Sequence, residues 1–303
     1  MIIDTHVHVV DASRFPLRPT GVGSTWWDAP DRDVGAFRAL MARHHVTAAV
    51  LVQPVGAYGY DNRCLLEALV EAGPALRGVA AVDLNDGSRT GAELAAEVGA
   101  VARREGVCGI RLFAVAPGTA WAEGEAVANP RSASGSRVRA VLAAARDAGL
   151  VVVLTVFAPQ LAGLAGVLAE FPELVVAVDH CAFPELDGAQ LAAGSPLLAV
   201  RDLGHVVLKV SSHLLEEAEA VGDPADLVSQ LSELFGPGRL VWGSDYPQTG
   251  DDYTALLALA ESATRHLDPE ARRAFIGVRA ADLFGFQPLV PTSGATSSEN
   301  AAI

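Results

Sequence analysis

The feature that most constrains the fold is a regular alternation of short β-branched segments with helical ones. Eight segments rich in valine, isoleucine and leucine have the length of a strand, at residues 2–10, 46–54, 78–84, 106–115, 150–158, 174–180, 205–212 and 239–247. Amphipathic or alanine-rich segments such as VGAFRALMARHH and CLLEALVEAG lie between them. Eight successive strand–helix units predict an α/β fold of the (β/α)8 TIM-barrel type in a single domain.

A doubly wound parallel sheet is the alternative arrangement for the same alternation. That fold usually carries a Gly-x-Gly-x-x-Gly turn after its first strand, and no such turn follows residues 2–10. The barrel is therefore favoured. We expect it to occupy residues 1–288, and we expect the small, polar segment 289–303 to be a disordered tail.

Composition limits the partners of the chain. Half of the 303 residues are hydrophobic and 19% are charged, as in a packed globular protein. The net charge of −14 argues against nucleic acid and against anionic membranes, but it does not exclude a small anionic substrate. A homo-oligomer stays open, because Trp26 and Trp27 could cover either the barrel mouth or a subunit contact.

The cysteines and the N-terminus favour a cytoplasmic protein. Cys64, Cys108 and Cys181 are far apart and form no Cys-x-x-Cys motif, so we expect reduced thiols. Asp4 and His6 interrupt any secretory signal at the N-terminus. The uncharged segment 149–169 is predicted to be a buried strand, a turn and a helix rather than a membrane span, since its first half is β-branched.

Polar residues gather where the predicted strands end. The carboxyl ends of barrel strands form the active-site face, so charged groups there are candidates for chemistry. They are His6 and His8, Arg111, Asp179 and His180, Lys209 and Ser211, and Asp245. Residues two apart on a strand point to the same side, so His6 and His8 should share one face. Barrel closure would place Asp245 of the last strand beside this pair.

Two long connections, 11–30 and 116–136, also follow strands. They therefore lie on the same face as the polar residues, where long loops often act as lids. The first contains Trp26 and Trp27, and the second contains Trp121.

The ordered motifs resemble those of the amidohydrolase-related family. They are DTHVHVV, VQPVGAYGYDN, GVCGIR, VDHCAFP, LKVSS and WGSDYP. The set is most similar to the branch that contains 2-pyrone-4,6-dicarboxylate lactonase and related sugar and muconolactone lactonases. His-x-His alone is a weak signal, but in order with the other segments it becomes specific.

The resemblance implies a hydrolase that opens a small lactone with Asp245 as general base. His6, His8 and His180 would polarise the carbonyl or hold a divalent metal that does so. The resemblance also implies that the substrate is bound by Arg111, Tyr58, Tyr60 and Asn62, with Lys209 and Ser211 as weaker candidates.

Metal dependence stays open at this level. Metal-binding relatives offer a histidine at the end of the fifth strand, where this chain has Thr155 and Phe157. His6, His8 and Asp245 would then hold a zinc ion, with His180 as a fourth ligand. Three protein ligands and water make an acceptable zinc site, yet the pyrone lactonase type works without a metal. The sequence supports a site with a divalent metal and a metal-free site about equally.

Other differences from the relatives concern residues expected to contact the substrate. The dicarboxylate-binding relatives carry an arginine beyond the seventh strand, where this chain has His213, and Gln248 stands where relatives often have histidine. We therefore expect the ring-opening chemistry to persist with a substrate that is less charged or differently shaped.

Alternative interpretations remain. A decarboxylase or C–C hydrolase of the same superfamily would need the full metal set, and a binding barrel without catalysis would be expected to have lost Asp245 or the histidine pair. Arg111 and Lys209 could simply pair with buried carboxylates. Four further histidines are interpreted as structural, namely His44, His45, His205 and His266.

Overall fold

The strands of the protein form one sheet in chain order. The computed structural model describes residues 1–22, 25–116, 119, 121–122 and 127–286. Within these residues, eight parallel strands pair with their neighbours in sequence. They are β1 (Ile3–Val7), β2 (Ala48–Val52), β3 (Leu76–Ala81), β4 (Val107–Phe113), β5 (Val151–Thr155), β6 (Val176–Val178), β7 (Val206–Ser211) and β8 (Leu240–Gly243).

The sheet closes between its first and last strands. A parallel bridge joins Val7 to Tyr246, and the His8 amide donates to the Tyr246 carbonyl over 2.8 Å. The Asp245 amide donates to the His6 carbonyl over the same distance. The predicted (β/α)8 barrel is therefore confirmed, and the doubly wound alternative is wrong.

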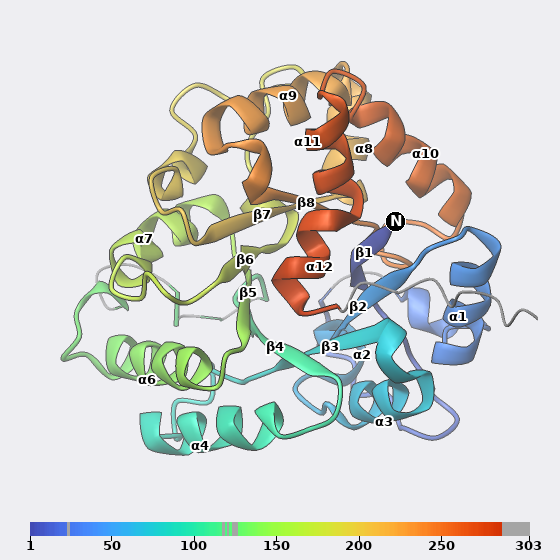
Figure 1. Cartoon of the computed structure of the whole chain (residues 1–303). Coiled ribbons are helices and arrows are strands. Elements are labelled where there is room, and N and C mark those ends of the chain that lie inside the picture. The colour runs from blue at the N-terminus through green and yellow to red at the C-terminus, as the bar shows by residue number, and fades with distance from the viewer. Residues whose placement is uncertain (23–24, 117–118, 120, 123–126, 287–303) are drawn as a thin grey trace, which may run out of the picture.

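Helices surround the barrel, as Figure 1 shows. The α-helices are α1 (Val34–Arg43), α2 (Val55–Tyr58), α3 (Arg63–Ala72), α4 (Gly91–Ala102), α6 (Ala133–Asp147), α7 (Ala158–Leu168), α8 (Ser212–Val221), α9 (Pro224–Phe235), α10 (Tyr253–Ala263), α11 (Pro269–Arg273) and α12 (Arg279–Phe284). The 3-10 helices η1 (Trp26–Asp28) and η3 (Asp179–Ala182) matter for the site.

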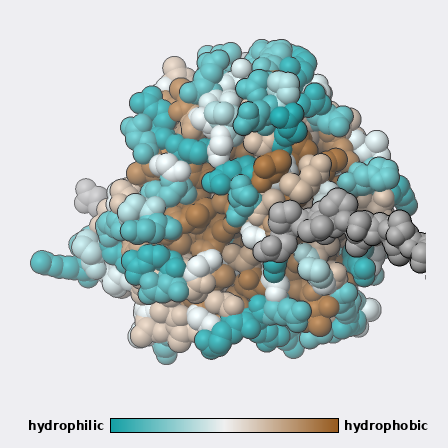
Figure 2. All heavy atoms as spheres, viewed as in Figure 1, coloured by the Kyte–Doolittle hydropathy of each residue, from teal (hydrophilic) through white to brown (hydrophobic). Residues whose placement is uncertain are grey.

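The apolar core has two main parts. The larger lies between the strands and the surrounding helices. The smaller fills the barrel interior with side chains such as Val50, Val153 and Val207, and α12 adds Leu283 and Phe284 to it. In Figure 1, α12 crosses the end of the barrel, and Figure 2 shows hydrophobic residues toward the centre of this face. The N-terminal end is thus closed by packing, which leaves the opposite end for a site.

Several local predictions can be compared with the structure. Segment 149–169 contains β5 and the whole of α7, and the three cysteines are free thiols. In the described part of the chain, every helix is too short or too polar to cross a membrane. The predicted tail 289–303 lies outside the described residues. The first strand is shorter than expected: it ends at Val7, and its register with β2 shifts between Asp4 and Val7.

Candidate active site

A cavity of about 220 Å³ opens at the carboxyl ends of the strands. Its wall combines polar side chains from several strand ends with a larger apolar surface. The lining residues are His8, Val22, Trp26, Trp27, Pro54, Val55, Gly56, Arg111, Phe113, Val115, Thr155, His180, Phe183, His213, Asp245, Gln248 and Thr249. This is the face where the sequence predicts the active site.

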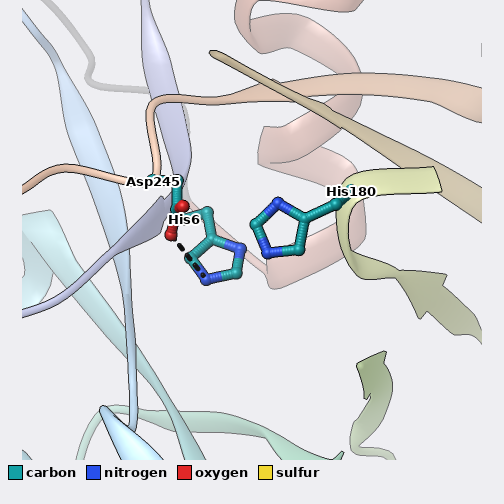
Figure 3. A group of neighbouring side chains, drawn as sticks. All are labelled: His6, His180 and Asp245. Carbon is teal, nitrogen blue, oxygen red and sulfur yellow. Dashed lines mark ion pairs between the residues drawn. The ribbon is translucent and has the colours of Figure 1, made fainter. Parts of the chain in front are cut away.

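Asp245 lies beside both histidines of the first strand. Its Oδ1 is 3.5 Å from Nε2 of His6 and 3.4 Å from Nε2 of His8. Its Oδ2 accepts a hydrogen bond from the Thr249 hydroxyl over 2.9 Å. Figure 3 shows Asp245 facing the ring of His6, with the His180 ring on the other side of His6. Asp245, which follows β8, therefore lies beside the histidines of the first strand, as expected from barrel closure.

His8 stands just past the end of β1 and has a fixed ring orientation. Its Nδ1 lies 2.7 Å from the Val52 carbonyl, which can only accept, so Nδ1 carries the proton. In the neutral ring, Nε2 then presents a lone pair toward Asp245. The Trp26 ring stacks on His8 at a centroid distance of 5.9 Å, and its Nε1 donates to Gln248 over 2.6 Å. These contacts shield one side of the site.

His180 reaches the cavity from an unusual turn. Four consecutive residues from His180 to Phe183 have positive φ angles between 49° and 62°, and none of them is glycine. L-residues adopt this left-handed conformation at a cost of about 1–2 kcal/mol each. The turn holds His180 so that its Nδ1 lies 2.8 Å from the Ser211 hydroxyl. Its Nε2 is then the nitrogen that a ligand can meet.

A buried polar network lies beneath the cavity, centred on Asp179. Lys209 donates to Oδ1 of Asp179 over 2.7 Å, and Arg111 and Thr155 donate to Oδ2 over 3.2 Å and 2.7 Å. Nδ1 of His6 is 3.1 Å from Oδ1 of the same carboxylate. The network therefore fixes the ring of His6 from below and matches two buried cations to one buried anion.

The charge states of the site follow from burial. Burial lowers the pKa of His180 to about 4, and the carboxylates of Asp245 and Asp179 only partly oppose it. Burial likewise holds the pKa of His6 well below its usual range. For Asp245, burial alone would raise the pKa, but His180, His8 and His6 outweigh it and lower the pKa. Neutral imidazoles of His6 and His180 therefore lie near an ionised carboxylate at neutral pH.

The WGSDYP segment explains how Asp245 is placed. A Cβ at Gly243 would lie 2.7 Å from the Cβ of His6, so only glycine lets this strand approach β1 so closely. The buried Asp4 carboxylate accepts from the Ser244 amide over 2.8 Å and from the Tyr253 hydroxyl over 2.8 Å. Asp4 therefore links β1 to the segment that follows β8, at the point where the barrel closes.

Three residues near the cavity fit a divalent ion. His6, His180 and Asp245 each offer one ligand atom, and these atoms all lie within 4.8 Å of one another. Nε2 of His6 is buried and has no hydrogen-bond partner among the described residues. Two neutral imidazoles and a carboxylate are ligands that zinc accepts. Of the predicted ligands, His8 lies outside this group, and its Nε2 is 3.4 Å from Oδ1 of Asp245.

Five predicted substrate-binding residues lie outside the cavity lining. Lys209 is 1% exposed and pairs with Asp179, and the buried Ser211 contacts His180. Tyr58 packs in an apolar cluster, where its hydroxyl accepts from the Asp11 amide. The hydroxyl of Tyr60 accepts from Asn85, and Asn62 bonds to both the amide and the carbonyl of Ala81.

Those side chains bind the protein itself because they lie below or beside the strand ends. Arg111 does line the cavity, but it donates to Thr155 over 2.8 Å, to the Gln53 carbonyl over 2.9 Å and to Asp179. Pairing with a buried carboxylate, which the sequence left open for Arg111 and Lys209, is what the structure shows for both.

Sequence reasoning did not anticipate several wall residues. Phe113 and Thr249 line the cavity outside the quoted motifs, and Phe183, which lies in VDHCAFP, was given no role there. Phe183 reaches it through the left-handed turn, which has no glycine or other sequence signal. Thr249 could have been suspected, because it follows Asp245 by four residues in the same loop.

Comparison with protein families decides the classification. The family model described as amidohydrolase matches residues 3–286. The chain belongs to the amidohydrolase family. This amidohydrolase is therefore an enzyme, and the resemblance predicted from the motifs is confirmed. Among curated proteins, none matches the chain.

Solved structures share the fold of this amidohydrolase. A Pseudomonas putida protein provisionally assigned as a 2-pyrone-4,6-dicarboxylic acid hydrolase is 26% identical, with a TM-score of 0.69, and the match covers 94% of this chain and 98% of that one. A Burkholderia multivorans amidohydrolase with bound zinc is 22% identical, with a TM-score of 0.69 and coverage of 95% and 100%. The second similarity shows the fold alone.

A more distant neighbour catalyses another reaction. The 5-carboxyvanillate decarboxylase of Novosphingobium aromaticivorans, in complex with manganese, is 13% identical, with a TM-score of 0.65 and coverage of 94% and 96%. The same barrel thus carries hydrolases and decarboxylases, so the reaction must be argued from the residues of this site.

Proposed function

We propose that this amidohydrolase opens a small lactone by water attack, with Asp245 as general base. The observation that carries the proposal is the position of the Asp245 carboxylate on the cavity wall, within 3.5 Å of ring nitrogens of His6 and His8. Its lowered pKa keeps it ionised at neutral pH. The resemblance of the motifs to lactonases supports the same reaction.

The proton movements can be assigned to this chain's residues. Oδ1 of Asp245 takes a proton from water as the water oxygen bonds to the lactone carbonyl carbon. The ring C–O bond then breaks, and Asp245 returns the proton to the departing alkoxide. The product is a hydroxy acid, which loses its own proton to solvent. Asp245 ends in its starting state, so the cycle is balanced.

His180 is placed to stabilise the oxygen that gains charge. The Ser211 hydroxyl can donate or accept, so it does not fix the tautomer of His180. With Ser211 donating to Nδ1, the His180 Nε2–H becomes a hydrogen-bond donor toward the substrate oxygen. In serine proteases, removal of one such oxyanion donor lowers kcat by about 10²–10³-fold.

The alternative tautomer of His180 would let it hold a metal. His6, His180 and Asp245 are the residues that would bind one divalent ion. Such an ion would polarise the carbonyl and make water more acidic. The Burkholderia multivorans relative with bound zinc supports this version of the site.

A decarboxylase is less well supported by the residues. Thr155 or Phe157 stands where metal-binding relatives are expected to carry a histidine, and the Thr155 hydroxyl is occupied by Arg111 and Asp179. That position is therefore part of the buried network rather than a ligand site. Release of carbon dioxide from an aromatic carboxylic acid would favour the decarboxylase over the lactone-opening hydrolase.

Replacing Asp245 tests the proposed reaction. The Asp245→Asn variant should lose about 10²–10⁴-fold in kcat on lactones, as for removal of a general base. Asparagine tolerates the positive φ of 56° at this position, so the fold should persist. Asp251→Asn is the matched control, because the Asp251 side chain is exposed and its carboxylate pairs with Arg32. Proton release during ring opening can be followed with a pH indicator, and full turnover by Asp245→Asn would rule out the mechanism.

A further inference from the structure

We propose that the preferred substrate is an uncharged lactone with an apolar ring substituent, in contrast to a carboxylated or polyhydroxylated one. This inference rests on the lactone-opening function proposed above and concerns the same cavity. It follows from three properties of the wall, namely its apolar surface, the pairing of its arginine with a buried carboxylate and its few available polar groups.

The larger part of the wall is apolar. Two tryptophans and two phenylalanines contribute flat surfaces, and aliphatic side chains fill the space between them. The apolar lining residues are Val22, Trp26, Trp27, Pro54, Val55, Phe113, Val115 and Phe183. Ligand sites of this kind hold their ligand mainly by apolar burial and orient it with a few polar groups.

The arginine and the lysine near the cavity already share a carboxylate partner. Arg111 is the only arginine or lysine among the described lining residues, and it donates to Asp179. Its guanidinium also lies 5.0 Å from the centre of the Phe113 ring. Lys209 is directed to the same carboxylate from a buried position. The sequence has neither arginine nor lysine at 23–24, 117–118, 120 or 123–126.

Asp245 is the one carboxylate among the described residues that line the cavity. The Asp245 carboxylate lies on its wall, where Oδ2 accepts from the Thr249 hydroxyl over 2.9 Å. A substrate carboxylate would therefore meet a like charge, while the guanidinium of Arg111 is already directed to Asp179. Like charges in a partly buried site repel strongly, since the surrounding dielectric is low. An uncharged ring avoids this repulsion.

The polar side chains of the wall have limited capacity for hydroxyl groups. Thr155 is bonded to Arg111 and Asp179, and the Thr249 hydroxyl donates to Asp245. Gln248 accepts from the Trp26 indole. A sugar lactone would have to break such bonds to satisfy its own hydroxyls. The volume of about 220 Å³ is also below the range typical of drug-sized ligands, which indicates a compact ring.

The first test compares three δ-lactones by kcat/KM. The probes are a butyl-substituted δ-valerolactone, the same ring with a carboxylate in place of the butyl group, and glucono-δ-lactone. We expect at least a tenfold preference for the butyl compound over each of the others. Faster opening of the carboxylated or the sugar lactone would overturn the inference while the lactone-opening function stands.

Binding separates the two proposals if no lactone is opened. In that case the proposed reaction fails, and calorimetry with butyl-substituted and carboxylated cyclohexanones tests the cavity alone. Tighter binding of the butyl ketone supports the inference, and equal or tighter binding of the carboxylated ketone overturns it.

A charge insertion gives a matched pair of variants. Gln248→Arg places a cation on the cavity wall and should shift the kcat/KM ratio about tenfold toward the carboxylated lactone. Gln190→Arg adds the same charge at an exposed residue outside the lining and should leave the ratio unchanged. An unchanged ratio in Gln248→Arg would show that charge at the wall does not set the preference.

Discussion

Nζ of Lys209 lies 2.7 Å from Oδ1 of Asp179, and both side chains are almost completely buried beneath the cavity. Lys209 is the only lysine in the sequence, where the other cationic side chains are arginines. Burial lowers the pKa of Lys209, which Asp179 opposes. For Asp179, burial would raise the pKa, but His6, Lys209 and Arg111 together lower it well below its usual range.

This pair should matter for stability. Lys209→Met leaves Asp179 with one cation fewer in a buried site, and we expect the free energy of unfolding to fall by about 3–5 kcal/mol. Arg38→Met removes an exposed cation of α1 and should stay within about 0.5 kcal/mol. Urea denaturation measures both. A loss below about 1 kcal/mol in Lys209→Met would show that the network does not depend on the ammonium group.

The left-handed turn after β6 predicts an unusual tolerance of glycine. Ala182 has a φ of 62° and is buried. In Ala182→Gly, relief of about 1–2 kcal/mol of backbone strain offsets the lost methyl contact of about 0.8 kcal/mol and the entropy of glycine. We expect a change within about 0.5 kcal/mol.

The control for that variant is Ala145→Gly, at a buried position within α6. There the same change should cost about 2 kcal/mol, from helix propensity and the lost methyl group. Equal losses at both positions would contradict the strained conformation of the turn.

His180 predicts a pH dependence of stability in the metal-free protein. Its pKa is about 4 when folded and about 6.5 when unfolded, so the unfolded chain binds more protons between these values. Stability should therefore decrease as the pH falls from about 6.5 to about 4, by up to about 3 kcal/mol from this group. Urea denaturation with EDTA present measures it. The slope should be smaller in His180→Gln, and an unchanged slope would exclude His180 as its source.

Metal binding gives a further expected outcome. Adding Zn²⁺ to protein stripped with a chelator should stabilise it, by about 2.7 kcal/mol at a hundredfold excess over Kd. His180→Gln should lose this response. Asp226→Asn should keep it, because Asp226 belongs to a separate surface group with Asp223 and His266. Thermal unfolding and the zinc content of untagged protein are the measurements. If zinc stabilised His180→Gln as much as the unchanged protein, the ion would have to bind at another site.

Much of the fold could be predicted because its signals are local. Each strand is a short β-branched run and each helix repeats its apolar face, so both are visible in a few residues of sequence. The positions of His6, His8, His180 and Asp245 also followed, because the carboxyl ends of barrel strands must meet at one face. The register shift in β1 could not be predicted in this way, since it depends on how β1 pairs with β2.

The sequence by itself determined the barrel, the family and the side of the barrel on which Asp245 and the histidines lie. Only the tertiary structure decided which polar groups reach the cavity. Lys209, Tyr58 and Asn62 bind other parts of the protein, and Arg111 is matched by Asp179, 68 residues away. The physical reason is that a buried polar group must find its partner in space, and such partners come from strands that are distant in the chain.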